Sequence, residues 1–280
     1  MIVFINGQFV EEENASLRLN DLSVQRGYAA FDFFRTRNYI PLFLDDYLQR
    51  FFNSMDRMHL TSPYSKKELK SIIDELINKS FLPDVGIRLL ITGGYSADGY
   101  EMSTPNFIIS QHKIQLTDAL KFSNGIKVIT HEYLRDLPEV KSINYLMGVW
   151  LQKEVKDKNA ADVLYHKQGI VSEFPRSNIF IVDKDGALIT PAENVLPGIT
   201  RKKLIEVAGK KLRVELRTVG LDEVKNAAEV FMTSTTKRLL PITTIDDQVI
   251  GSGKAGQITT LLNDAFLEME EEYISSTVLK

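Results

Sequence analysis

The chain of 280 residues contains no cysteine. This absence excludes disulfide bonds, thiolate zinc sites and cysteine nucleophiles together. The four histidines are far apart and lack the spacing of metal ligands; they are His59, His112, His131 and His166. We therefore do not expect catalysis by a bound metal ion.

Long apolar runs are also absent. Residues 1–7 are too few for the apolar core of a signal peptide, and no apolar run approaches the length that spans a membrane. The net charge is -3, with acidic and basic residues interspersed, so there is no basic stripe for nucleic acid. We expect a cytoplasmic protein that binds neither membranes nor nucleic acids.

Three common fingerprints are missing as well. The sequence has no Gly-x-x-x-x-Gly-Lys phosphate loop, no Gly-x-Gly-x-x-Gly dinucleotide motif and no Gly-x-Ser-x-Gly nucleophile elbow. What is present is a chain with 44% hydrophobic residues, long enough for one large or two medium domains. A mixed polar and charged stretch predicts a linker over residues 114–124, between an N-terminal α/β domain (1–113) and a C-terminal domain (125–280).

Local signals predict how the N-terminal domain begins. Residues 2–10 alternate around Asn6-Gly7, which predicts a β-hairpin. Further on, Ser65 and Glu68 have the spacing of a capping box at the start of an amphipathic helix.

Two arginines of this domain lie in otherwise apolar patterns. Arg50 flanks the apolar face of a helix that Asp45 can cap, so it either covers the edge of the core or binds an anion. Arg88 interrupts an apolar strand over residues 86–92, where a charge is costly unless it is paired. An internal salt bridge and recognition of a substrate carboxylate explain Arg88 equally well.

Lys141 lies between the turn of residues 135–138 and a helix predicted over residues 144–158. A lysine drawn into a partly dry pocket loses proton affinity and becomes an amine nucleophile that forms Schiff bases. The alternative is an ordinary surface lysine, which is the commoner case for any one lysine.

Two further segments are suited to binding an anion. Thr200 is the expected N-cap of a helix over residues 201–212, whose first turn, Arg201-Lys202-Lys203, carries cations where the helix dipole disfavours them. An anion at this N-terminus would remove the conflict, although exposed cations there cost little. The hydroxyl cluster of residues 233–236 could bind a phosphate or form an ordinary turn.

A Schiff-base lysine, an acid and anion-binding turns are what pyridoxal phosphate requires. In this sequence they occur within blocks that resemble the signature blocks of the class IV aminotransferases. These blocks are Arg26-Gly27 to Asp32, the Asp45–Ser54 helix, Lys141-Ser142-x-Asn144-Tyr145, Ser172-Glu173 with Ser177-Asn178-Ile179-Phe180, Leu196 to Arg201, and Thr233 to Thr236. The resemblance runs from about residue 5 to about residue 262 and keeps the order of the blocks.

The family resemblance implies a fold-type IV enzyme of the α/β class. Its N-terminal domain would be an α/β sandwich, and its C-terminal domain would be β-barrel-like with helices and would bind pyridoxal 5'-phosphate. The site would lie between the domains and be completed in a homodimer. The implied reaction transfers an amino group from an amino acid to a 2-oxo acid; the alternative is an aminodeoxychorismate lyase-type enzyme that releases pyruvate.

The same resemblance implies roles for individual residues. Lys141 matches the catalytic lysine that forms the Schiff base, and Glu173 matches the carboxylate that faces the pyridine nitrogen. The other residues that match cofactor ligands are Arg50, Tyr145, Ser177, Asn178, Leu196, Gly198, Ile199, Thr200, Ser234 and Thr235. Those expected to bind the substrate are Phe31, Arg88, Tyr100, Arg176 and Thr236.

Some residues depart from the family pattern. Asp98 and Tyr100 stand where the D-amino-acid enzymes carry an arginine and a histidine, which speaks against D-amino-acid specificity. Gly86 replaces a tyrosine of the branched-chain enzymes. The sequence therefore predicts the family and leaves the substrate open.

Overall fold

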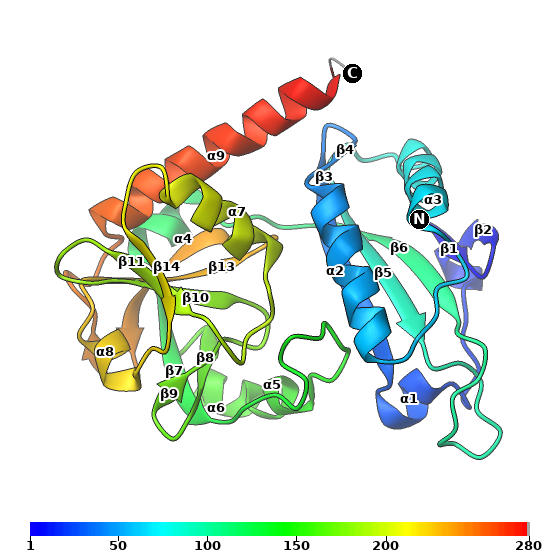
Figure 1. The fold of residues 1–280 in the computed structure, drawn as a ribbon, viewed down its shortest axis with the longest axis horizontal. Coiled ribbons are helices and arrows are strands. Elements are labelled where there is room, and N and C mark those ends of the chain that lie inside the picture. Colours follow the sequence, from blue (N-terminus) through cyan, green and yellow to red (C-terminus); the bar gives the residue numbers. More distant parts are fainter. Residues whose placement is uncertain (279–280) are drawn as a thin grey trace. The chain divides into compact units, whose positions relative to one another are not determined.

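The computed structural model describes residues 1–278 and divides the chain into two compact units (Figure 1). The first unit contains Met1–Ile114, the segment Val140–Asn144 and the described end of the chain from Tyr273. The second unit contains Gln115–Glu139 and Tyr145–Glu272. The short segment Val140–Asn144 thus packs with the N-terminal residues, although residues of the second unit precede and follow it in the sequence.

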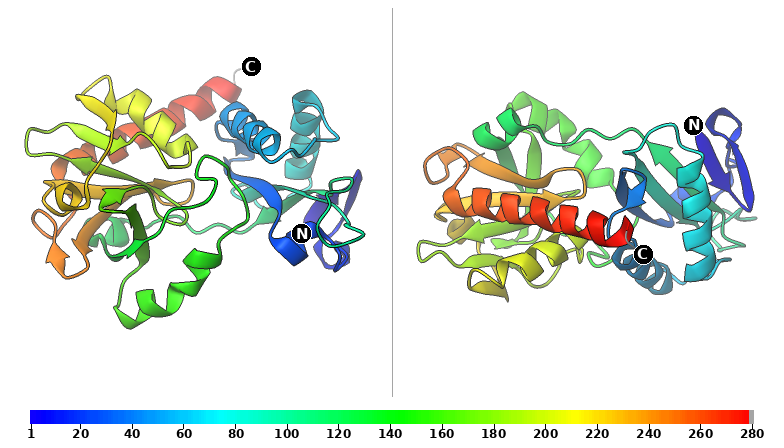
Figure 2. Two further views of the ribbon diagram at one scale, coloured as in Figure 1. Left: turned by 60° about the horizontal axis from the view of Figure 1, so that its bottom comes forward. Right: turned by 90° about the horizontal axis from the view of Figure 1, so that it is seen from above.

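The first unit is built on a six-stranded antiparallel sheet in the order β2-β1-β6-β5-β3-β4. Its strands are β1 (Ile2–Ile5), β2 (Gln8–Glu11), β3 (Ala29–Arg37), β4 (Ile40–Pro41), β5 (Gly86–Thr92) and β6 (Phe107–His112). Its helices are η1 (Glu12–Asn14), α1 (Leu22–Arg26), α2 (Leu44–Arg57) and α3 (Lys66–Asn78). Helices α2 and α3 lie on one side of the sheet (Figure 2), and because side chains alternate along a strand, every second residue of β3 and β5 points away from them.

The predicted hairpin and capping box are both present. Asn6 and Gly7 have positive φ angles of 47° and 91°, which a two-residue hairpin loop requires. The Ser65 hydroxyl accepts a hydrogen bond from the Glu68 backbone N–H, and the Glu68 carboxylate accepts one from the Ser65 N–H. These two local signals determine the pairing of β1 with β2 and the start of α3.

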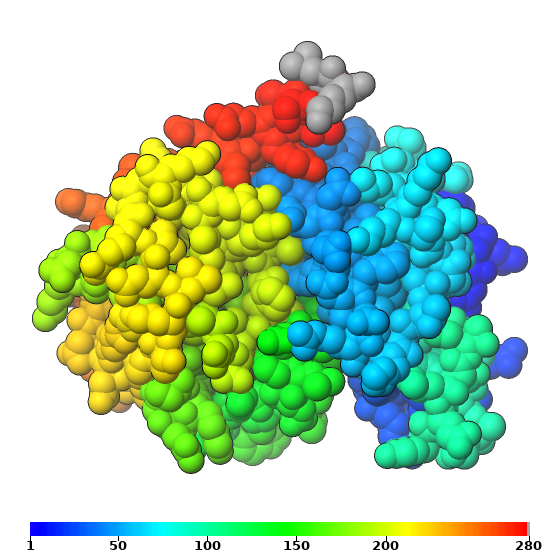
Figure 3. Space-filling view, in the orientation of Figure 1, coloured from blue at the N-terminus to red at the C-terminus, as the bar shows by residue number. Residues whose placement is uncertain are grey.

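The second unit contains a nine-stranded sheet in the order β12-β11-β10-β13-β14-β7-β8-β9, with β15 paired to β14. The strands are β7 (Ile126–Glu132), β8 (Asp162–Lys167), β9 (Ile170–Val171), β10 (Asn178–Val182), β11 (Leu188–Pro191), β12 (Val214–Arg217), β13 (Glu229–Ser234), β14 (Arg238–Ile245) and β15 (Gln248–Val249). Leu164 of β8 and Ile179 of β10 belong to one buried cluster, although three strands separate β8 from β10 in the sheet. The sheet must therefore curl around a common core. Residues that follow β11 in the sequence, drawn in yellow, cover much of this unit on the face shown in Figure 3.

Six helices accompany this sheet in the described residues: α4 (Ala119–Asn124), α5 (Leu146–Trp150), α6 (Gln152–Asp157), α7 (Ile199–Ala208), α8 (Leu221–Lys225) and α9 (Gln257–Val278). Helix α4 lies within the predicted linker and is capped by Asp118, whose carboxylate accepts the Lys121 N–H at 2.7 Å. The helix predicted over residues 144–158 is two short helices, α5 and α6, which meet at the buried Leu151. In the described part of the chain no helix has the length and apolarity to cross a membrane.

Two predicted helix starts are wrong. The N-cap of α2 is Phe43, and Asp45 lies in the first turn, where its charge suits the helix dipole. The N-cap of α7 is Gly198 rather than Thr200. A Cβ atom at position 198 would lie 2.0 Å from the Asn178 side-chain oxygen, so any residue other than glycine would force this packed amide to shift.

Candidate active site

The backbone of Lys141 is held against β3 and α2. Its carbonyl accepts the Phe31 N–H at 2.9 Å, and its own N–H donates to the Ser54 hydroxyl at 3.1 Å. The next residue, Ser142, forms a β-bridge with Ala30. The segment Val140–Asn144 therefore continues the sheet of the first unit locally, and this pairing sets the direction of the lysine side chain.

The Phe31 ring brings two predicted site residues together. The Lys141 Nζ atom and the Arg88 Cζ atom each lie 4.7 Å from the ring centroid. Both cations can interact favourably with the π face of an aromatic ring at this distance. Lys141, the predicted nucleophile, and Arg88 thus contact the same aromatic ring.

The neighbouring residues on this side of the sheet are polar and aromatic. Arg88 lies opposite Phe33 on β3 and opposite Ser110 on β6. The Ser110 hydroxyl and the His112 Nε2 are 2.8 Å apart, and burial, together with the charge of Arg88, lowers the pKa of His112. Both causes favour the neutral form of the imidazole beside a cationic group.

Gly86, one of the departures from the family pattern, has a steric reason here. A Cβ atom at this position would lie 2.2 Å from the Phe33 ring. The Phe33 ring thus occupies the space that a larger residue at position 86 would need. Any residue other than glycine at position 86 would therefore force the Phe33 ring on the paired strand β3 to shift.

Arg50 forms a buried ion pair that neither of its predicted explanations included. Its Nε and Nη2 atoms donate to the two carboxylate oxygens of Asp32 at 2.9 and 2.6 Å, and Asp32 is fully buried. The guanidinium also lies 5.2 Å from the centroid of the Tyr47 ring. Arg50 is therefore oriented by a bidentate contact, which is among the strongest that arginine makes.

In the second unit, Glu173 lies at the centre of a network of hydrogen bonds. Arg135 donates to its Oε1 through Nε at 2.8 Å and through Nη2 at 2.6 Å. The Leu196 N–H donates to Oε2 at 3.0 Å, and the Asn178 amide lies 3.5 Å from the same oxygen. Arg135 also donates to the Pro138 carbonyl. The carboxylate is thus neutralised by a cation and oriented by backbone and amide donors.

The start of α7 adjoins this network. The Asn178 amide donates to the Leu196 carbonyl at 2.9 Å, and its oxygen fills the space beside Gly198. Ile199 and Thr200 follow as the first, buried residues of the helix. The N–H groups of a first helical turn have no partner within the helix and point toward its N-terminus, where they favour an anion.

Two cations of this first turn have partners within the protein. Arg201 donates to the Thr190 hydroxyl at 3.2 Å and to the Pro191 carbonyl at 2.8 Å, and burial lowers its pKa. Lys203 forms an ion pair with Glu206 at 3.1 Å. Arg201 is thus satisfied by the residues that end β11, and Lys203 by an acid one turn further along the same helix.

The remaining predicted residues lie at four places. Tyr100 belongs to the loop after β5 and is 81% exposed, and Asp98 holds this loop by accepting the Tyr100 N–H. Tyr145 is the N-cap of α5. The others lie at two turns of the second unit: Arg176 and Ser177 before β10, and Ser234, the last residue of β13, with Thr235 and Thr236 directly after it.

Sequence reasoning missed the partners that hold these groups: Asp32 for Arg50, Arg135 for Glu173, and Lys237, whose Nζ atom lies 3.2 Å from the Ser177 hydroxyl. Asp32 had a usable signal, because an acid inside an apolar strand needs a partner as much as Arg88 does.

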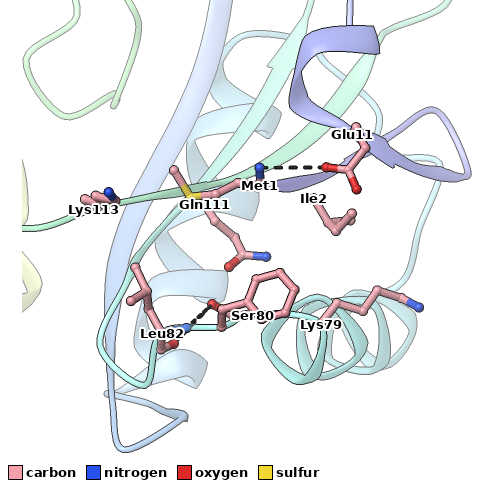
Figure 4. Close-up of a pocket in the computed structure, with 9 residues that line it drawn as sticks. Met1, Ile2, Glu11, Lys79, Ser80, Leu82, Gln111 and Lys113 are labelled. Atoms are coloured by element: carbon pink, nitrogen blue, oxygen red, sulfur yellow. Dashed lines mark hydrogen bonds and ion pairs between the residues drawn. The ribbon is translucent and has the colours of Figure 1, made fainter.

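A pocket of about 340 Å³ lies elsewhere in the first unit, between the start of the chain, the end of α3 and β6 (Figure 4). Gln111 and Leu82 point into it, and the Met1 amine pairs with Glu11 at its rim. It contains none of the predicted site residues. The described residues also contain no group of three or more histidines and acids placed to hold a metal ion.

Comparison with known proteins identifies the family. A family model described as amino-transferase class IV matches residues 29–245. A D-alanine aminotransferase of Bacillus licheniformis is 30% identical over 265 residues, which cover 92% of this chain and 93% of that protein. The D-alanine aminotransferase of Listeria monocytogenes serotype 4b is 30% identical over 277 residues and 96% of each chain.

Solved structures agree on the fold. The branched-chain amino acid aminotransferase of Escherichia coli superposes with a TM-score of 0.89 at 24% identity, over 95% of this chain and 93% of that chain. The branched-chain aminotransferase of the thermophilic archaeon Thermoproteus uzoniensis, solved with norvaline, gives a TM-score of 0.87 at 23% identity, over 98% and 97%. The predicted fold-type IV architecture, with its α/β domain and curled β sheet, is thereby confirmed.

The family match and the relatives also test the predicted activity. Transamination between an amino acid and a 2-oxo acid, with pyridoxal phosphate as the cofactor, is confirmed as the predicted reaction class. The lyase alternative is not favoured, because the family and the relatives compared are aminotransferases. The chain belongs to the class IV aminotransferase family.

Proposed function

We propose that Lys141 is the lysine of this aminotransferase that becomes joined to pyridoxal phosphate, and that Arg88 binds the carboxylate of the amino acid. The bound cofactor supplies an aldehyde for the amino group and a ring that accepts electrons from the α carbon. Lys141 is then the base that removes the α proton and returns it at the end of the transfer. Phe31 forms the wall against which the substrate lies.

The observation that carries this proposal is the shared contact of Lys141 and Arg88 with Phe31. Each cation lies 4.7 Å from the ring centroid, so the proposed carboxylate-binding group and the proposed base both adjoin the aromatic wall against which we place the amino acid. A bidentate guanidinium fixes the plane of a carboxylate, which is the positioning that a proton transfer needs.

The residues of the second unit fit the cofactor by the chemistry of their donors. Glu173 presents an oriented carboxylate, which suits a protonated pyridine nitrogen. The N-terminus of α7 at Gly198, Ile199 and Thr200 offers N–H donors of the kind that bind phosphate. Thr233, on the strand that leads to Ser234 and Thr235, has a buried hydroxyl that makes no hydrogen bond to another described residue.

We assign the remaining roles by the match to the family. Tyr145, Ser177, Asn178 and Leu196 contact the cofactor ring or its substituents, and Arg50, fixed by Asp32, joins the phosphate site. Tyr100, Arg176 and Thr236 complete the substrate pocket. We also propose that the enzyme is a homodimer that acts in the cytoplasm, as the sequence predicted.

The test is the replacement of Lys141 by alanine, with Lys153→Ala as the matched control on the exposed surface of α6. We expect Lys141→Ala to lower the rate of transamination at least about a thousandfold, because the nucleophile and the base are lost together. Borohydride should fix the cofactor mass to the wild type and to Lys153→Ala but not to Lys141→Ala. Retained activity in Lys141→Ala would overturn the proposal.

A second experiment determines the substrate. D- and L-amino acids are offered as donors, with pyruvate or 2-oxoglutarate as the acceptor, and the new amino acid is resolved by chirality. The 30% identical relatives are D-alanine aminotransferases, whereas Asp98 and Tyr100 lack the carboxylate-binding side chains of the D-amino-acid enzymes. Release of many equivalents of pyruvate per enzyme from a donor without any acceptor would contradict transamination, because a transaminase releases at most one equivalent before it needs an acceptor.

A further inference from the structure

Lys237 is a mostly buried lysine that the proposed function does not use. It lies in the turn between β13 and β14, and its side chain is 22% exposed. The Nζ atom donates to the Ser177 hydroxyl at 3.2 Å and forms an ion pair with Asp162 at 3.5 Å. Burial and the nearby charge of Arg176 lower the pKa of Lys237, and Asp162 opposes this shift. A cation kept in such a place needs an explanation.

The partners of Lys237 lie on both sides of its own strands in the curled sheet. Asp162 begins β8, and Ser177 directly precedes β10. In the order β10-β13-β14-β7-β8, the turn between β13 and β14 lies between these strands. One ammonium group therefore ties together the ends of strands that are not hydrogen-bonded to one another.

The chemistry of an ammonium determines what Ser177 can do. An ammonium has only donors, so the Ser177 oxygen must act as the acceptor of this hydrogen bond. Its own proton then points elsewhere and remains available to a ligand. A hydroxyl that accepts a charge-assisted hydrogen bond is also polarised, which makes it a better donor.

We infer that Lys237 is a positioning residue, which presents the Ser177 hydroxyl as a donor to pyridoxal phosphate and holds the Ser234–Thr236 turn beside it. The inference rests on the proposed function, which assigns Ser177 and this turn to the cofactor. The Lys237 N–H donates to the Ser234 hydroxyl at 3.3 Å, so backbone and side chain of this one residue reach both hydroxyl groups.

A purely structural role would be the neutralisation of Asp162. This carboxylate is 4% exposed, and its Oδ2 accepts no hydrogen bond among the described residues, so the ion pair with Lys237 offsets its burial. Removing the lysine would leave an unpaired buried charge. The two roles are separable, because Asp162→Asn removes the charge without touching Ser177.

The experiment measures the Kd for pyridoxal phosphate by equilibrium dialysis and the Tm of the same proteins. We expect Lys237→Met to lower the Tm and to raise the Kd about tenfold, the loss typical of one hydrogen bond to a charged group. The double variant Lys237→Met/Asp162→Asn should regain most of the Tm while its Kd stays raised. Adding Ser177→Ala to Lys237→Met should raise the Kd no further.

Lys225→Met is the matched control, because it removes another lysine paired with an aspartate, Asp246, in the same unit. Its Kd should equal that of the wild type. A wild-type Kd in Lys237→Met/Asp162→Asn would overturn the inference and leave the proposed function standing. Failure of the wild type to bind pyridoxal phosphate would overturn both.

Discussion

Lys141 in the first unit and Glu173 in the second are held in different ways. In the first unit the backbone of Lys141 is fixed by Phe31 and Ser54, and its ammonium lies over an aromatic ring. In the second unit the reactive end of Glu173 is itself fixed, by a guanidinium and a backbone N–H. Contacts to a ring are weak and tolerate movement, whereas charge-assisted hydrogen bonds fix both distance and direction.

This difference agrees with the proposed roles. A lysine that exchanges partners and carries a proton must move its amine while its backbone stays in place. A carboxylate that faces one ring nitrogen throughout the reaction gains from a fixed orientation. Substitutions in the second unit should therefore reduce stability and cofactor affinity, and substitutions around Phe31 should change turnover with little loss of stability.

The largest effect on stability is expected from Arg135→Met. This change leaves the buried carboxylate of Glu173 without its cation, which costs about 3–5 kcal/mol in comparable cases. Urea unfolding followed by circular dichroism measures the loss. The control is Arg213→Met, because Arg213 is 65% exposed and its ion pairs should contribute about 1 kcal/mol or less. Equal losses in both variants would contradict the special position of Glu173.

Gly198→Ala should have a smaller effect in the same unit. The new methyl group would lie 2.0 Å from the Asn178 oxygen, and shifting this packed amide should cost about 1–3 kcal/mol of stability. Gly220→Ala is a close control, because Gly220 is also a helix N-cap with extended backbone and has open space around its Cβ position. Equal Tm values for the two variants would show that the Asn178 contact does not constrain the start of α7.

Several local features of the backbone could be predicted from the sequence alone. Signals within a few residues were sufficient for the hairpin at Asn6-Gly7, the capping box at Ser65 and the strand Gly86–Thr92. In each case the backbone is determined by neighbours in the sequence. The family blocks added the fold and the reaction class, because they preserve several such local patterns in order.

Partners that lie far apart in the sequence could not be read in this way. Arg135 and Glu173 are 38 residues apart, and the pairing of Lys237 with Asp162 depends on how the sheet curls. The close contact of the Asn178 side chain with Gly198, the N-cap of α7, is likewise formed between residues that are distant in the sequence. Tertiary contacts decide these features, and periodicity along the chain does not encode them.

Arg88→Met tests the first unit. If Arg88 binds the substrate carboxylate, its loss should raise the KM for the amino acid about tenfold and change kcat less. Arg88→Lys should recover part of the loss, because an ammonium keeps the charge without the bidentate geometry. The Tm of both variants should remain near that of the wild type. A large fall in Tm with an unchanged KM would instead support an internal structural role for Arg88.

The smallest effect is expected from Phe31→Leu, and it tests the ring contact most directly. Leucine keeps the apolar wall but removes the π face over which Lys141 and Arg88 lie, a contribution of about 0.5–1 kcal/mol. The value of kcat/KM should fall about two- to fivefold, with little change in stability. Phe33→Leu is the matched control, because it makes the same change on β3 at a ring that lies beside Gly86. A loss of the same size in both variants would mean that the wall matters only for its shape, whereas a loss confined to Phe31→Leu would show that the ring acts on the charges themselves.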